Sequence, residues 1–218
     1  MNTSVLSPAV VDELTASFEA AREFNYPFKH WELSQVLPEA LTRQILAVRI
    51  PQTSGFSYDG TRASDSKVRE QGTPPKRMFL DQKTNAEYSF FQDLVDALLD
   101  KSVLEIVERK FGVPTKDLYL RVEYINDYDG FFLDPHKDIV EKRFSMLLYL
   151  DDGPEHMGTD FYDADLNVVK THAFRHNHAY LFVPGNDTWH GLERKPIPDR
   201  RCSLLINYVT FKTDFPVL

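Results

Sequence analysis

The second half of the chain carries four short segments rich in aromatic and β-branched residues, and no helical pattern separates them. Clusters of Gly, Pro, Asp and Asn, which are typical of turns, bound each segment. Strands that follow one another without intervening helices usually pair antiparallel, so this half predicts an antiparallel sandwich or barrel. The predicted strands are residues 118–125, 143–150, 178–184 and 201–211.

The first half of the chain has a different periodicity. Apolar residues there recur at three- and four-residue intervals, as they do in amphipathic helices. Helices are predicted over residues 8–24 with Ser7 as N-cap, from Pro38 onward, and over 86–111, where Ser102 is the N-cap of a second helix and Gly112 ends it. We therefore expect a mainly β protein of the α+β class, in which residues 1–117 form a helical support in the same domain as a β core over 118–218.

A long polar segment interrupts the predicted helices at about residues 52–77. It contains several Gly, Pro and Ser residues and has neither helical nor strand periodicity. Plain connections of this length are uncommon in compact domains, so the segment is expected to be a lid, a binding loop or an ordinary surface loop. Three cationic residues in or near it, Arg62, Lys76 and Arg77, would suit an anionic substrate.

Charge and composition restrict the classes of partner. The 218 residues include 25 Lys and Arg against 33 Asp and Glu, a formal net charge of −8. This charge opposes contacts with phosphates, so no nucleic-acid partner is expected. No apolar stretch is long enough to cross a membrane, and neither a leader pattern nor a second cysteine beside Cys202 is present. A cytoplasmic protein with no membrane partner is expected.

The histidines are concentrated in the predicted β half, where six of the seven lie between residues 136 and 190. His136 and Asp138 stand two residues apart at the edge of a strand, so their side chains project from one face. His190 follows an apolar strand that could bring it to the same point. Two histidines and one carboxylate on one face of a metal leave adjacent positions open, which suits a non-haem Fe(II) centre that binds a co-substrate and O₂.

The last predicted strand places Arg201 and Ser203 on one side, because they are two residues apart. A guanidinium and a hydroxyl inside a barrel suit the distal carboxylate of a dicarboxylic co-substrate. Arg200 has the opposite phase and is expected outside.

The order His136-x-Asp138, His190, Arg201-x-Ser203 resembles that of the 2-oxoglutarate and Fe(II)-dependent oxygenases, especially the prolyl-4-hydroxylase-like branch. The segments RVEYINDYDGFFLDPHKD, FSMLLYLDD and HAYLFVPGNDTWHG resemble the same branch, and the likeness covers about residues 118–212. Many prolyl hydroxylase relatives use Lys for the co-substrate carboxylate, so the Arg-x-Ser pair is more similar to bacterial and small-molecule members.

This resemblance implies a double-stranded β-helix, a jelly-roll or cupin-like core with supporting N-terminal helices. It implies that the catalytic metal site is His136, Asp138 and His190, holding Fe(II). It also implies that Arg201 and Ser203 bind the C5 carboxylate of 2-oxoglutarate, and that Tyr124 hydrogen-bonds to this co-substrate. The expected enzyme is a dioxygenase that uses O₂, with ascorbate as an optional reductant, and releases succinate and CO₂.

The expected reaction is hydroxylation or another oxidation of a C–H bond, because the intact His-x-Asp pair disfavours halogenation in this family. The substrate is left open between a small molecule, an anionic one included, and a group borne on a carrier or protein. Loops and extensions set substrate choice in this architecture, and the sequence does not give their shape. The oligomeric state is equally open.

Two other classes of protein compete with this interpretation. His172, His176 and His178 form an H-x₃-H-x-H pattern that a cupin-like metal enzyme could use. A metal-free β-sandwich could instead bind a glycan or peptide through its many tyrosines and phenylalanines. The first alternative leaves the His136, Asp138, His190 and Arg201 set unexplained.

Overall fold

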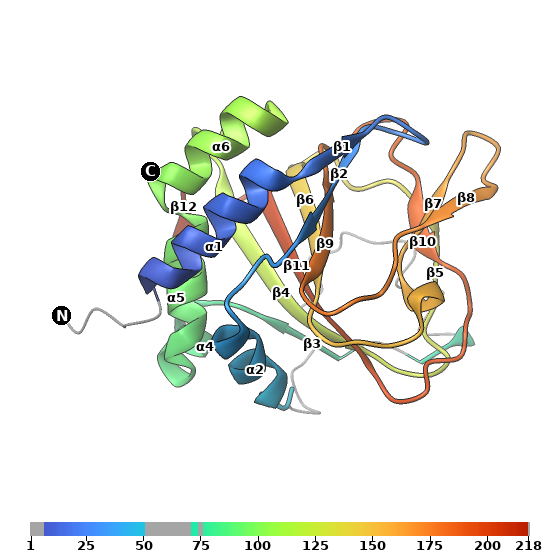
Figure 1. The fold of residues 1–218 in the computed structure, drawn as a ribbon, viewed down its shortest axis with the longest axis horizontal. Coiled ribbons are helices and arrows are strands. Elements are labelled where there is room, and N and C mark those ends of the chain that lie inside the picture. Colours follow the sequence, from blue (N-terminus) through green and yellow to red (C-terminus); the bar gives the residue numbers. More distant parts are fainter. Residues whose placement is uncertain (1–6, 51–70, 74–75, 218) are drawn as a thin grey trace.

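The computed structural model describes residues 7–50, 71–73 and 76–217. Its core consists of two antiparallel sheets that face each other, with helices on the outer side of the larger sheet (Figure 1). The large sheet has the order β1 (Arg22–Phe24), β2 (His30–Ser34), β9 (His178–Phe182), β6 (Lys142–Tyr149), β11 (Arg201–Val209), β4 (Tyr119–Asp127) and β12 (Phe215–Pro216), with β3 (Lys76–Phe79) also paired to β4. The small sheet has the order β5 (Leu133–His136), β10 (His190–Leu192), β7 (Asp160–Tyr162) and β8 (Val168–Thr171). This is the predicted jelly-roll arrangement of a double-stranded β-helix.

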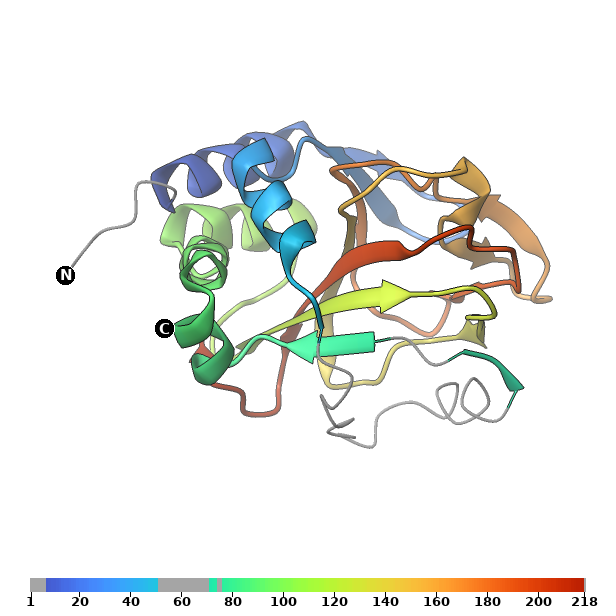
Figure 2. The same cartoon turned by 90° about the horizontal axis from the view of Figure 1, so that it is seen from below.

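The helices pack together at one end and on one face of the large sheet (Figure 2). They are α1 (Ser7–Ala20), α2 (Glu39–Ala47), α4 (Gln82–Glu87), α5 (Ser89–Leu98) and α6 (Lys101–Phe111), and a short 3₁₀ helix, η1 (Glu155–Met157), precedes β7. Their apolar faces and the outer face of the sheet form one hydrophobic core, in which Leu14, Phe18 and Phe144 are fully buried. A second, aromatic core fills part of the space between the sheets.

Side-chain alternation along β4 and β11 determines which residues reach the space between the sheets. Tyr124 and Leu204 belong to the core under the helices. Asp127, Arg201 and Ser203 have the other phase and line a cavity between the sheets. Because β4 and β11 pair without interruption from Arg201↔Asp127 to Val209↔Tyr119, this register fixes the relative positions of those cavity residues.

The sequence predicts the β half well. All four predicted strands are present as β4, β6, β9 and β11, with ends that differ by one or two residues. Helices also occur in each predicted region, and Gly112 ends α6 with a left-handed φ of 71°. That backbone conformation favours glycine.

Three predictions for the first half are wrong. Residues 22–24 form β1 instead of the end of a helix, and β1, β2 and β3 add three strands to the large sheet, so the first half is more than a helical support. These strands are three to five residues long, which is too short to show a clear alternation of apolar and polar residues in the sequence. The N-cap of α6 is Asp100, whose carboxylate accepts from the Ser102 backbone N–H at 2.8 Å.

Most of the polar segment at about 52–77 lies outside the described residues, so its predicted lid or loop character remains a prediction. Within the part of the chain that the structure covers, no helix combines the length and the apolar character needed to cross a bilayer.

Candidate active site

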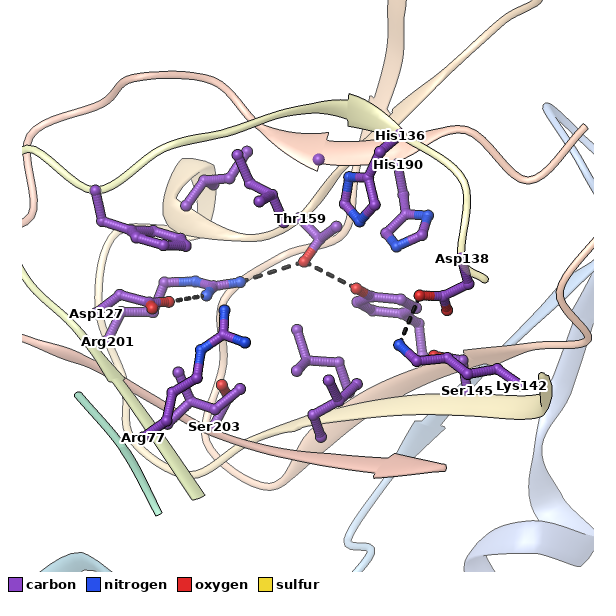
Figure 3. Close-up of a pocket in the computed structure, with 18 residues that line it drawn as sticks. Arg77, Asp127, His136, Asp138, Lys142, Ser145, Thr159, His190, Arg201 and Ser203 are labelled. Atoms are coloured by element: carbon purple, nitrogen blue, oxygen red, sulfur yellow. Dashed lines mark hydrogen bonds and ion pairs between the residues drawn. The ribbon is translucent and has the colours of Figure 1, made fainter. Parts of the chain in front are cut away.

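A cavity between the two sheets contains most of the predicted site residues (Figure 3). One end holds His136, Asp138 and His190, and the other holds Arg201 and Ser203. Apolar side chains, Leu147 among them, also line the cavity. The cavity therefore has a metal-ligand end and a cationic end.

The metal-ligand end is assembled by the pairing of β5 and β10. His136 and His190 lie directly opposite each other in this antiparallel pair, with ring centroids 4.3 Å apart. Asp138 follows β5 by two residues. One ligand atom from each of the three residues lies within 4.8 Å of the others, close enough to hold one metal ion. The described residues bring no second such group together.

Backbone carbonyls orient both imidazole rings. His136 Nδ1 lies 2.9 Å from the Asp134 carbonyl oxygen, and His190 Nδ1 lies 2.9 Å from the Thr188 carbonyl oxygen. A carbonyl oxygen only accepts hydrogen bonds, so each Nδ1 carries the proton and each Nε2 keeps the lone pair that a metal needs. Asp134 thus contributes its main-chain carbonyl to the site.

Asp138 is oriented by a buried lysine that the sequence analysis did not identify. Lys142 Nζ lies 2.6 Å from Asp138 Oδ1, and both side chains are at most 5% exposed. The lysine stands four residues beyond the aspartate, at the start of β6, where it lines the cavity. Holding one carboxylate oxygen fixes the plane of the group and the direction of the other oxygen.

At the cationic end, Arg201 is buried, and its guanidinium group contacts Asp127, Met157 and Thr159. Its Nη1 lies 2.5 Å from Asp127 Oδ2, and its Nε donates to the Met157 carbonyl at 2.8 Å. Burial alone would lower the pKa of Arg201, but Tyr149 and Asp127 outweigh that effect and raise it above its usual value. The guanidinium is therefore a permanent, positioned cation.

Thr159 links the two ends of the cavity and was also missed. Its Oγ1 lies 3.2 Å from Arg201 Nη2, 3.0 Å from the Tyr149 hydroxyl and 3.1 Å from the Tyr180 hydroxyl. Tyr180 is buried, which raises the pKa of its hydroxyl well above the usual value. Strand phase could have identified Tyr180, because Ala179 and Leu181 face the other core. It could not have identified Thr159, which precedes β7, or Lys142, which has the same phase as the core residue Phe144.

The structure contradicts the prediction for Tyr124. This side chain is fully buried in the core beneath the helices and does not line the cavity. Side chains alternate in direction along β4, and Ile125 and Asp127 line the cavity. Tyr124, one position before Ile125, therefore faces away from the cavity. Tyr124 therefore cannot contact a co-substrate held there.

Arg200 and Arg201 take the sides that the alternation predicts. Arg201 lines the cavity, whereas the Arg200 guanidinium contacts the Leu46 carbonyl and lies 3.9 Å from Asp151. Ser203 lines the cavity next to Arg201 along β11, as expected. Arg77, which the sequence had only suggested as an anion-binding residue, also lines the cavity.

The alternative histidine set does not form a metal site. His172 is buried against Tyr149 and Tyr180, and burial lowers its pKa to about 4. His176 instead pairs with Glu39 at 2.9 Å, and His178 Nδ1 bonds the His176 carbonyl. These rings serve separate local contacts, so the cupin-like interpretation is wrong for the described residues.

Comparisons with known proteins identify the fold. No family model matches the sequence, and no curated protein matches it. Among solved structures, a prolyl-4-hydroxylase from Pseudomonas putida is 15% identical with a TM-score of 0.56, covering 94% of this chain and 100% of the other. A Trichoplax adhaerens prolyl hydroxylase, solved with a hypoxia inducible factor peptide fragment, is 16% identical with a TM-score of 0.60, covering 94% and 89%.

A third similar structure is HygX from Streptomyces hygroscopicus, solved with nickel and 2-oxoglutarate bound. It is 15% identical with a TM-score of 0.54, and the match covers 85% of this chain and 84% of the other. These likenesses extend over nearly the whole chain, including the half without a recognisable sequence motif. The chain therefore has the fold of the 2-oxoglutarate and Fe(II)-dependent oxygenases, with prolyl hydroxylases among its structural neighbours.

Proposed function

We propose that this protein is a 2-oxoglutarate and Fe(II)-dependent dioxygenase, an oxidoreductase that hydroxylates or otherwise oxidises a C–H bond. One observation carries the proposal. Two histidines and an aspartate converge within 4.8 Å at one end of a cavity whose other end holds a buried arginine. A metal centre and a carboxylate anchor in one cavity are the two features that binding of 2-oxoglutarate requires.

The residues present fit Fe(II). The donor set is two neutral imidazoles with their Nε2 atoms available and one carboxylate, which suits Fe(II) with open positions for a co-substrate and O₂. When bound, iron together with 2-oxoglutarate and O₂ supplies the oxidising power, and succinate and CO₂ are released. The protein supplies the binding groups and their geometry.

The chain's own residues divide the work of binding. His136, Asp138 and His190 would hold the metal, with Lys142 keeping the carboxylate of Asp138 in position. Arg201, with Ser203 beside it on β11, would bind the C5 carboxylate of 2-oxoglutarate.

The substrate belongs to one of two classes, a small molecule or a group borne on a carrier or protein. The structural neighbours include examples of both kinds, a prolyl hydroxylase with a peptide and the epimerase SnoN of nogalamycin biosynthesis. The polar segment at about 52–77 joins β3 at the cavity wall and would contribute to substrate choice.

Uncoupled turnover tests the proposal without knowledge of the substrate. Purified protein supplied with Fe(II), ascorbate, O₂ and 2-oxoglutarate should release succinate slowly, and His136→Ala or Asp138→Ala should abolish the release. His178→Ala, which alters a histidine outside the cavity, should leave it unchanged. Succinate release that is equal in wild type and His136→Ala would contradict the assignment of the metal site.

A further inference from the structure

A second arginine reaches the cationic end of the cavity from a strand outside the recognised motif. Arg77 lies on β3, pairs in register with Ile125 of β4, and has a side chain only 10% exposed. Ile125 in turn pairs with Ser203 of β11. Arg77, Ile125 and Ser203 therefore form one row across three adjacent strands, on the face that lines the cavity.

The next row along the sheet contains Arg201 paired with Asp127. The two rows are consecutive on one face, with β4 between the strands that carry the two arginines, and both arginines line the cavity. Figure 3 shows both guanidinium groups extending into the same end of the cavity, where Ser203 also lies. Two guanidinium groups at one end of a cavity favour the binding of an anion there.

Each of the two arginines has a carboxylate beside it. Asp127 binds Arg201 at 2.5 Å, and this contact offsets the charge of that arginine. Glu123 lies 3.4 Å from Arg77 and 3.1 Å from Arg121. Arg201 also directs N–H groups toward Met157 and Thr159, which uses part of its hydrogen-bonding capacity.

We infer that Arg77 is a second binding residue for the distal carboxylate of the dicarboxylic co-substrate, so that this carboxylate lies between two guanidinium groups. The inference rests on the proposed function. Planar guanidinium groups bind carboxylates through paired N–H donors, and two of them would select a dicarboxylic keto acid over one without the second carboxylate. The N-terminal half of the chain thereby supplies part of the co-substrate site.

Calorimetric titration of Mn(II)-loaded protein with 2-oxoglutarate tests the inference, since Mn(II) occupies such sites without turnover. Arg77→Met should weaken 2-oxoglutarate binding about 10- to 100-fold, the range expected for loss of a charge-assisted hydrogen bond. Arg77→Lys should bind with intermediate affinity, because the charge remains but the planar fork is lost. The affinity for 2-oxobutyrate, which lacks the distal carboxylate, should be the same in wild type and Arg77→Met.

Arg121→Met is the matched control. Arg121 contacts the same Glu123 carboxylate but is not among the cavity-lining residues, so its loss should weaken 2-oxoglutarate binding far less than Arg77→Met does. Thermal unfolding of each variant establishes that it is folded. Equal 2-oxoglutarate affinity in folded Arg77→Met and wild type, or equal weakening of both keto acids, would overturn the inference. Failure of the wild type itself to bind 2-oxoglutarate would instead refute the proposed function.

Discussion

Thr159 connects groups that the sequence places far apart. Its hydroxyl contacts the guanidinium of Arg201 and the hydroxyls of Tyr149 and Tyr180, all within 3.2 Å. Tyr149 OH also accepts from the Thr159 backbone N–H at 2.8 Å, so the tyrosine fixes the position of the threonine. A buried network of this kind orients Arg201 before any ligand enters.

Replacing Thr159 by valine removes the hydroxyl but keeps the shape of the side chain. Arg201 then loses one of its supporting contacts, and we expect 2-oxoglutarate affinity to fall roughly tenfold, or about 1.4 kcal/mol. Titration of the Mn(II)-loaded protein measures this. Thr159→Ser retains the hydroxyl and should bind almost as the wild type does, whereas unchanged affinity in Thr159→Val would show that the network does not support the arginine.

His172 makes the stability of the fold depend on pH. Burial lowers its pKa to about 4, against 6.5 for an ordinary histidine, and Lys170 and His30 lower it further while Glu32 opposes them. Between pH 6.5 and 4 the unfolded chain binds a proton that the folded chain excludes, so folding stability falls as the pH falls through this window. Above pH 6.5 both states are neutral at this position and the effect is absent.

His172→Asn should therefore reduce the slope of unfolding free energy against pH between 4 and 6.5 by up to about 1.4 kcal/mol per pH unit. Urea unfolding at several pH values gives the slope. His176→Asn is the control. The pKa of His176, which pairs with Glu39, is raised instead of lowered, so its loss should not reduce the slope of unfolding free energy against pH. Equal slopes in wild type and His172→Asn would contradict the account.

At the scale of elements, the pairing of β5 with β10 brings the metal ligands together. Gly191, directly after His190, lies so close to β5 that an added Cβ would stand 2.5 Å from the Leu133 carbonyl oxygen and 3.1 Å from the Asp134 carbonyl oxygen. The Asp134 carbonyl is the group that orients His136. Close approach of these two backbones is therefore a requirement of the site.

Gly191→Ala should force β5 and β10 apart and disturb the orientation of His136. We expect the affinity for Mn(II) to fall about 10- to 100-fold, the range seen when the support of a metal ligand is lost. Stability should fall by about 1 to 3 kcal/mol from the overpacking. Gly185→Ala is the comparison, because its nearest contact would be the side chain of Asp187. Similar metal affinity in both variants would show that this backbone contact does not matter.

At the scale of the whole molecule, the sequence predicts the β half and its metal residues because their signals are local. Alternation in β11 correctly separates Arg201 from Arg200, and the His136-x-Asp138 spacing places both side chains together. The prediction for Tyr124 is wrong because it came from the family resemblance alone. Tyr124 is one residue before Ile125, which lines the cavity, so its side chain points to the opposite face.

Other features depend on contacts between distant segments, which no local pattern encodes. The strands β1, β2 and β3 are short, and they are strands because the edges of the large sheet accept them. The contribution of Thr159, Lys142 and Arg77 to the cavity likewise depends on how distant segments pack together. The fold class was therefore predictable, but the complete lining of the cavity was not.

An anaerobic titration of the protein with Fe(II) and 2-oxoglutarate tests the proposed dioxygenase function, since the chelate formed on iron gives a weak charge-transfer absorption in the visible region. We expect this absorption in the wild type and its loss in His136→Ala. In Arg201→Ala the absorption should appear only at 2-oxoglutarate concentrations about 10- to 100-fold higher. Well-folded wild-type protein without the absorption, or a wild-type response in His136→Ala, would contradict the proposed function.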